Sequence, residues 1–104
     1  MAAEIKAQIN GEAATVHISG NVDERGAEAL KGQFTALPVA KLKEVVVDMG
    51  AVQNIGSSGI GKLLLFYKTL AVGGSSLRVI NLPPHLHELF LELKFDTLFT
   101  ISAK

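Results

Sequence analysis

A segment rich in glycine and serine lies between two strongly apolar runs, and it constrains the fold more than any other part of the chain. The first run is Val45–Val47, and the second is Leu63–Phe66. A short run of valines is typical of a buried strand, whereas a leucine-rich run of this kind indicates a buried helix. Residues 48–61 are therefore predicted to connect a buried strand to a buried helix, with two serine hydroxyls at the start of that helix.

The N-terminal part of the chain alternates between apolar and polar residues. This period of two extends from Glu4 to Asn10 and again from Ala13 to Ser19, as expected for strands with one buried face. Asn10-Gly11 separates the two segments, and this pair tolerates the positive φ angles of a tight turn. A β-hairpin is therefore predicted here.

Proline and glycine divide the rest of the chain into alternating helices and strands. Pro38 ends the first helix, Gly73-Gly74 ends the second, and Pro83-Pro84 opens the third. The predicted elements are a helix from Asp23 to about Leu37, a strand over Lys43–Asp48, a helix from about Ser58 to Ala71, a strand over Leu77–Asn81, a helix carrying Leu86, Leu89, Phe90 and Leu93, and a strand over Thr97–Ser102.

The order β-β-α-β-α-β-α-β predicts an α/β fold with a mixed, mostly parallel sheet. Residues 1–104 suffice for one domain and are too few for two. Polar side chains such as Lys6, His17 and Arg78 occupy the outer positions of the strands. We therefore expect one face of the sheet to be partly solvated and the helices to lie mainly on the other face.

Composition argues against several classes of function. Ten basic residues balance ten acidic ones without a basic run, so nucleic-acid binding is not expected. No cysteine is present, which removes disulfides, thiolate metal sites and a cysteine nucleophile. The three histidines have no metal-ligand spacing, so no metal is expected. No signal peptide or membrane-spanning run is found, and a cytoplasmic protein without membrane insertion is predicted.

Catalytic patterns also fail around the glycine- and serine-rich segment. Gly59 and Gly61 do not continue into G-x-G-x-x-G, and Gly61-Lys62 is followed by Leu63 where a P-loop requires serine or threonine. Ile60 stands where the hydrolase pattern G-x-S-x-G requires glycine. We therefore predict no enzymatic activity and no cofactor, with a small enzyme or nucleotide-binding protein as the weakest hypothesis.

Simple structural roles remain open for the polar residues. Ser57 or Ser58 would cap the second helix, Asp23 would cap the first, and Asp48 would form a hydrogen bond within a loop. The alternative for the serines is an exposed recognition or anion site, because a helix N-terminus stabilises negative charge. The apolar circumference of the second helix, with Ile60 and Lys62 in its first turns, indicates a partner surface.

Several motifs together resemble the STAS domains of bacterial anti-sigma factor antagonists. The family segment has an acid at the end of the third strand, here Asp48, and Asp-Ser-Ser-Gly-Leu-Gly at the start of the following helix, here with Ser57–Gly61. Residues 19–23 (Ser-Gly-Asn-Val-Asp) resemble the family's segment after its second strand. Residues 73–83 and 95–101 resemble its fourth strand and its closing segment, so the likeness covers nearly the whole chain.

The resemblance implies a protein-binding switch. In this family the second serine is the phosphoacceptor, which corresponds to Ser58, with Ser57 the less favoured position. The partner is an anti-sigma factor that is also a serine-protein kinase, and the unphosphorylated domain binds it. The predicted partner-binding residues are Asp23, Asp48, Gly56, Ser57, Ser58, Gly59, Ile60 and Lys62.

One residue departs from the family pattern. Gly56 stands where the family has the acid that precedes the serine pair. This departure supports an alternative hypothesis, in which the chain is a non-switching STAS subunit of a larger assembly such as a lipid-transporting ABC complex.

Overall fold

The computed structural model describes residues 1–104 as a five-stranded sheet with three α-helices and two short 3-10 helices. The strands are β1 (Glu4–Asn10), β2 (Ala13–Val22), β3 (Glu44–Ile55), β4 (Ser76–Leu82) and β5 (Thr100–Ala103). The helices are α1 (Glu24–Ala36), α2 (Ser57–Val72) and α3 (Pro84–Glu92), and the 3-10 helices are η1 (Val39–Lys41) and η2 (Phe95–Thr97). No helix is both long enough and apolar enough to cross a membrane.

The sheet has the order β1-β2-β3-β4-β5. β1 and β2 form the predicted antiparallel hairpin, which pairs Glu4 with Ser19 and Asn10 with Ala13. Gly11 adopts a φ of 64° in the turn, a conformation that glycine tolerates without strain. All other neighbouring strands are parallel. The predicted α/β fold with a mixed, mostly parallel sheet is therefore confirmed.

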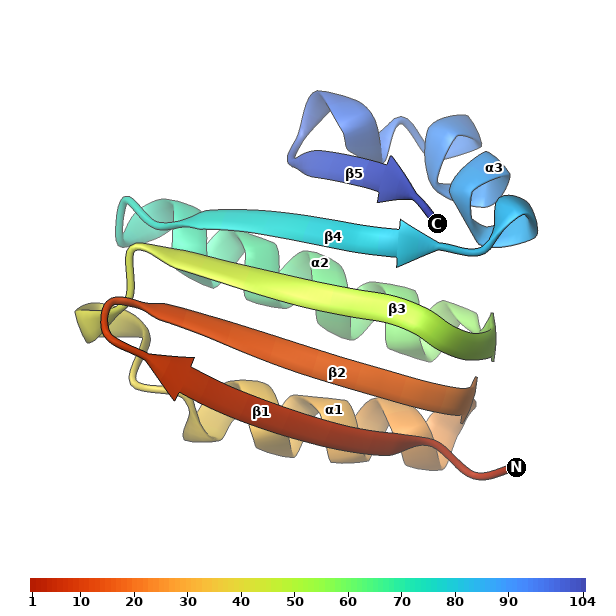
Figure 1. The fold of residues 1–104 in the computed structure, drawn as a ribbon, viewed down its shortest axis with the longest axis horizontal. Coiled ribbons are helices and arrows are strands. Elements are labelled where there is room, and N and C mark those ends of the chain that lie inside the picture. Colours follow the sequence, from red (N-terminus) through yellow and green to blue (C-terminus); the bar gives the residue numbers. More distant parts are fainter.

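The helical layer covers one face of the sheet. In Figure 1, α1 and α2 lie side by side behind the strands, while α3 lies beyond the carboxyl end of β4 near the β5 edge. The opposite face carries no helix and faces the viewer. Because a β-strand alternates its side chains, only every second residue enters the core, and the polar alternation of β1 and β2 follows from this arrangement.

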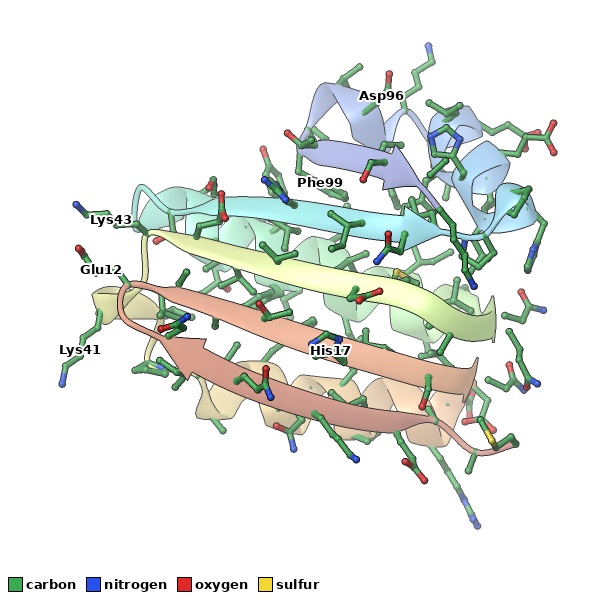
Figure 2. The ribbon with its side chains drawn as sticks, in the orientation of Figure 1. Glu12, His17, Lys41, Lys43, Asp96 and Phe99 are labelled. Atoms are coloured by element: carbon green, nitrogen blue, oxygen red, sulfur yellow. The ribbon has the colours of Figure 1, made fainter.

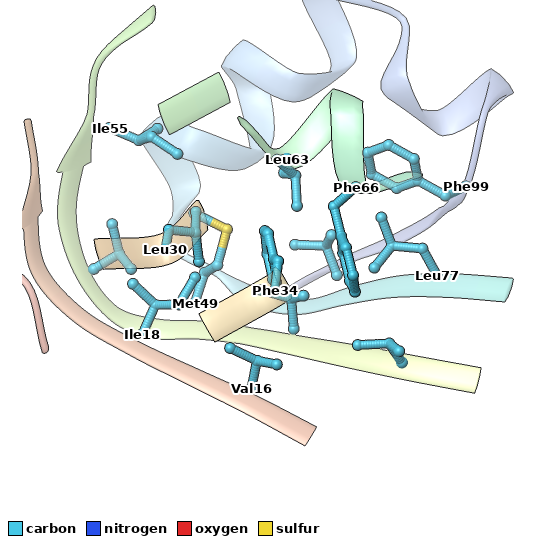
Figure 3. Close-up of a cluster of buried hydrophobic side chains, with 14 of the residues drawn as sticks. Val16, Ile18, Leu30, Phe34, Met49, Ile55, Leu63, Phe66, Leu77 and Phe99 are labelled. Carbon is cyan, nitrogen blue, oxygen red and sulfur yellow. The ribbon is translucent and has the colours of Figure 1, made fainter. Parts of the chain in front are cut away.

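The core is one cluster of 23 buried residues between the helices and the sheet. Figure 3 shows Phe34 of α1 and Phe66 of α2 facing each other within it. Their rings stack with centroids 3.9 Å apart, which joins the two helices above the sheet. At the other end of the layer, the rings of Phe90 of α3 and Phe95 meet edge to face, with centroids 5.1 Å apart. Both contacts tie the helices into the same core.

The structure corrects several predicted boundaries. β3 continues to Ile55, so the prediction that it ends at Asp48 was wrong. Met49, Val52 and Ile55 are buried core residues, and irregularities in the pairing of β2 with β3 keep them facing the helices. β2 likewise continues to Val22 rather than Ser19.

The last strand also differs from its predicted bounds. It begins at Thr100 rather than at Thr97, because residues 95–97 form η2. This turn buries Phe95 and Phe99 against the core before the chain joins the sheet. An apolar contact between two aromatic rings therefore takes precedence over the β-propensity of the segment.

Candidate functional site

β2 and β3 end side by side at one end of the sheet, and the helices that follow them, α1 and α2, begin there (right in Figure 1). The Gly56 N–H donates a hydrogen bond to the Val22 carbonyl at 2.9 Å, which holds the ends of β2 and β3 together. Asp23 and Gly56, the residues immediately after these strands, are the N-caps of α1 and α2. We call Asp23, Gly56, Ser57 and Ser58 the helix-start site.

Asp23 caps α1, as predicted. Its backbone is extended, and its side chain accepts a hydrogen bond from the Gly26 N–H at 2.9 Å. Gly26 is buried and packs closely against Ala3, so a small residue is favoured there. The carboxylate is thereby fixed at the surface beside the start of α2.

The serines do not cap α2, contrary to the first hypothesis for them. The chain is still extended at Gly56 (φ −86°, ψ 176°), so Gly56 is the N-cap and Ser57 and Ser58 already belong to the first turn. Neither serine hydroxyl forms a hydrogen bond with another group of the protein. Ser57 is exposed and Ser58 is half-buried, so both hydroxyls are unoccupied at the surface.

The backbone at the start of α2 favours negative charge. The first hydrogen bond of the helix runs from the Ile60 N–H to the Gly56 carbonyl at 3.1 Å. The N–H groups of Ser57, Ser58 and Gly59 therefore have no carbonyl partner within the helix. Together with the helix dipole, they stabilise an anion attached to or bound near this turn by about 0.3–1 kcal/mol.

Gly59 brings α2 close to the sheet. It is buried, and a Cβ at this position would lie 2.8 Å from the Cγ1 atoms of both Val22 and Ile55. Any larger side chain would push the first turn of α2 away from the ends of β2 and β3. Among the predicted partner-binding residues, Gly59 therefore contributes close packing and offers no exposed side chain.

Ile60 and Lys62 leave the first turns of α2 in different directions. Ile60 is half-buried and packs against the core. The Lys62 Nζ lies 3.7 Å from Glu28 Oε1 of α1 and links the two helices at the surface. Because Lys62 follows Ser58 by four residues, the two side chains share one side of the helix.

Asp48 lies apart from the helix-start site. It belongs to the helix-free face of the sheet, where His17 of the neighbouring strand also lies (Figure 2). Its carboxylate is 3.3 Å from His17 Nδ1 and accepts hydrogen bonds from the Gly50 N–H at 2.9 Å and the Asn81 side chain at 3.2 Å. Asp48 forms a hydrogen bond as predicted, but the prediction that this bond lies in a loop was wrong, because Asp48 and Gly50 both belong to β3.

Sequence reasoning did not single out His17 and Asn81 as partners of Asp48. Asn81 adopts a φ of 60°, a conformation that asparagine tolerates better than most residues. His17 faces Asp48 through the register between β2 and β3. Knowledge of this register was the only information that could have indicated the pairing. We call His17, Asp48 and Asn81 the open-face cluster.

Replacing Asp48 with alanine is expected to lower the free energy of unfolding by about 1–3 kcal/mol, because the Gly50 N–H and the Asn81 amide lose their acceptor. Thermal unfolding followed by circular dichroism measures this loss. Asp48→Asn is the matched control, since its side-chain oxygen still accepts from Gly50, and it should lose less. Equal stability of Asp48→Ala and the wild type would contradict a structural role for the carboxylate.

Fold and site together define a small α/β module with a helix-covered face, a helix-free face and an unoccupied serine pair at a helix start. The family model described as "Mlab, STAS domain" matches residues 5–100. The chain therefore belongs to the STAS domain family, as its motifs predicted.

Several known proteins are similar to this chain. BtrV of Bordetella bronchiseptica, assigned as an anti-sigma factor antagonist, is 29% identical over 85 residues, which cover 82% of this chain and 73% of BtrV. An anti-sigma factor antagonist from Mycobacterium paratuberculosis superposes with a TM-score of 0.86 at 21% identity, over 99% of this chain and 87% of that one. The phosphorylated form of SpoIIAA, a Bacillus cell fate determinant, gives 0.77 at 14% identity, over 97% and 93%.

Proposed function

We propose that this protein is an anti-sigma factor antagonist that binds an anti-sigma factor through the surface around the start of α2. The observation that carries the proposal is the pair of unbonded serine hydroxyls in the first turn of α2, beside the fixed carboxylate of Asp23. The similarity to BtrV over most of the chain supports it. No further chemistry is required, because binding alone removes the anti-sigma factor from its sigma factor.

We further propose that phosphorylation of Ser58 switches this binding. The Ser58 oxygen would form a bond to the γ-phosphorus of ATP, the bond to the β–γ bridging oxygen would break, and ADP would leave while the hydroxyl proton passes to the kinase. A phosphoserine adds about −1.5 to −2 charges at pH 7. The unpaired N–H groups of the first turn stabilise that charge within the protein, whereas a partner surface packed against it would be repelled.

Incubation with the cognate anti-sigma factor kinase and ATP is expected to add one phosphate to the protein, as measured by intact mass. Ser58→Ala should remove this addition, because the acceptor oxygen is lost. Ser57→Ala is the matched control and should keep it, although Ser57 is the more exposed of the two serines. Phosphate on Ser57 in the wild type, located by fragmentation of the peptide, would overturn the assignment to Ser58.

Gly56 provides a second test of the switch. A Cβ at this position would approach nothing closer than the Val22 carbonyl oxygen at 3.7 Å, and the backbone conformation suits any residue. Gly56→Asp would restore the acid of the family pattern and a capping side chain, with a gain in stability of a few tenths of a kcal/mol. We expect it to speed phosphorylation of Ser58, whereas Gly56→Asn, which caps without charge, should not.

The second candidate is a non-switching STAS subunit of a larger assembly, such as a lipid-transporting ABC complex. The absence of the acid at Gly56 favours it. This function predicts that transporter subunits co-purify with the protein from native lysate and that Ser58→Asp leaves their recovery unchanged. Recovery of an anti-sigma factor that is lost with Ser58→Asp would decide for the first function.

A further inference from the structure

A groove between α1 and α2 lies outside the helix-start site. It encloses about 290 Å³ on the outer side of the helical layer. The lining residues are Lys31, Phe34, Thr35, Leu37, Val39, Lys62, Leu65, Phe66 and Thr69. We call it the interhelical groove. It begins at Lys62, one helical turn beyond Ser58, and follows α2 toward its carboxyl end.

The floor of the interhelical groove is apolar and firmly built. The stacked rings of Phe34 and Phe66 form part of it, and both belong to the core. Leu65 borders the groove and is 57% exposed. Leu65 therefore continues the apolar surface of Phe34, Phe66, Leu37 and Val39, and a contiguous apolar surface of this kind marks a ligand-binding groove or a protein interaction site.

The charged residues that line the groove are both basic. Lys31 and Lys62 line it from α1 and α2, and no carboxylate does. Glu28 lies 3.7 Å from the Lys62 ammonium, but its own side chain is 69% exposed, so this surface pair costs little to break. A ligand that presents carboxylates on both sides of an apolar stripe would therefore complement the groove.

We propose that the interhelical groove binds an acidic amphipathic helix of a partner protein. Apolar side chains spaced at i, i+3 and i+4 would enter between α1 and α2, and flanking carboxylates would pair with Lys31 and Lys62. A helix fits because the groove is bordered by two neighbouring helices, α1 and α2. The proposal does not rest on phosphorylation of Ser58, so the kinase experiment and this one can fail independently.

Two synthetic helical peptides of about 18 residues, roughly the length of five turns, test the proposal. Both carry the same leucine stripe, and it is flanked by glutamates in one and by lysines in the other. Titrated into the ¹⁵N-labelled protein, the acidic peptide should shift the backbone amides of Lys31, Leu65 and Thr69 and bind at least tenfold more tightly than the basic one. Equal affinity of the two peptides, or shifts confined to the open-face cluster, would overturn the proposal.

Variants distinguish binding of the peptide in the groove from nonspecific binding. Leu65→Gln and Lys31→Glu change exposed side chains, and each should weaken the acidic peptide about tenfold. Leu91→Gln is the matched control, because this leucine of α3 is also exposed, at 42%, but lies outside the groove. Unchanged binding by Leu65→Gln would refute the site. If micromolar dodecanoate displaced the peptide, the groove would instead be assigned to a lipid. If sedimentation showed that the protein self-associates and that the peptide does not bind the associated form, the groove would be assigned to a second copy of the chain.

Discussion

Gly59→Ala is expected to lower the free energy of unfolding by about 2 kcal/mol, which corresponds to a fall in Tm of roughly 10 °C for a domain of this size. The added methyl group would lie 2.8 Å from Val22 Cγ1 and Ile55 Cγ1. Neither atom is the end of a flexible side chain, since valine is branched at Cβ and the isoleucine Cγ1 carries a further carbon. The first turn of α2 must therefore move, which costs more than the improved helix propensity of alanine returns.

Gly61→Ala is the matched control for this prediction. Gly61 lies two residues further along the same helix, and a Cβ there would meet nothing within 4 Å. Alanine at this exposed position should raise the stability by up to about 1 kcal/mol. Urea unfolding of both variants measures the difference, and similar stabilities would show that α2 does not need close contact at Gly59. A stable but displaced helix in Gly59→Ala should also alter binding at the helix-start site.

Ser58→Asp is expected to weaken binding of the anti-sigma factor about tenfold to a hundredfold, which corresponds to roughly 1.4–2.8 kcal/mol. The aspartate places one negative charge in the first turn of α2, where the unpaired N–H groups tolerate it. The fold should therefore remain stable while the partner surface is repelled. Titration calorimetry with the purified anti-sigma factor measures the affinity, and circular dichroism checks the fold.

Ser76→Asp controls for the added charge. Ser76 is an exposed serine at the start of β4, at the opposite end of the sheet from the helix-start site (Figure 1). It should leave the affinity unchanged. If Ser58→Asp and Ser76→Asp both bound the partner as tightly as the wild type does, the contact surface would lie elsewhere on the molecule. A loss with both variants would indicate a general effect of net charge rather than a local one.

The sequence was sufficient to predict the order of elements, the hairpin and the uncovered sheet face, because each depends on local periodicity. The continuation of β3 beyond Asp48 was missed for a physical reason. Glycine and asparagine residues between 50 and 54 favour a loop, yet Met49, Val52 and Ile55 are held in the sheet by contacts with the helices. Tertiary packing therefore overrides local propensity in this segment.

The candidate site was predicted in part. Asp23 lies near the serine pair because β2 and β3 are parallel neighbours and therefore end at the same end of the sheet. Asp48 lies on the other face because it follows Val46 by two residues in β3, whereas Val45 and Val47 face the helices. The continuous run of valines hid this alternation, because it is apolar at every position. Gly56, and not a serine, is the N-cap of α2. The serines therefore lie in the first turn, and their hydroxyls are free because they do not cap the helix.

The ordinary backbone at Gly56 has an evolutionary consequence. Its φ of −86° and the open space around its Cβ position mean that the fold does not demand glycine there. An aspartate can be gained or lost at this position by a single substitution without a penalty in folding. The fold therefore places no constraint on whether an acid precedes the serine pair, and only binding of the proposed partner would select for it.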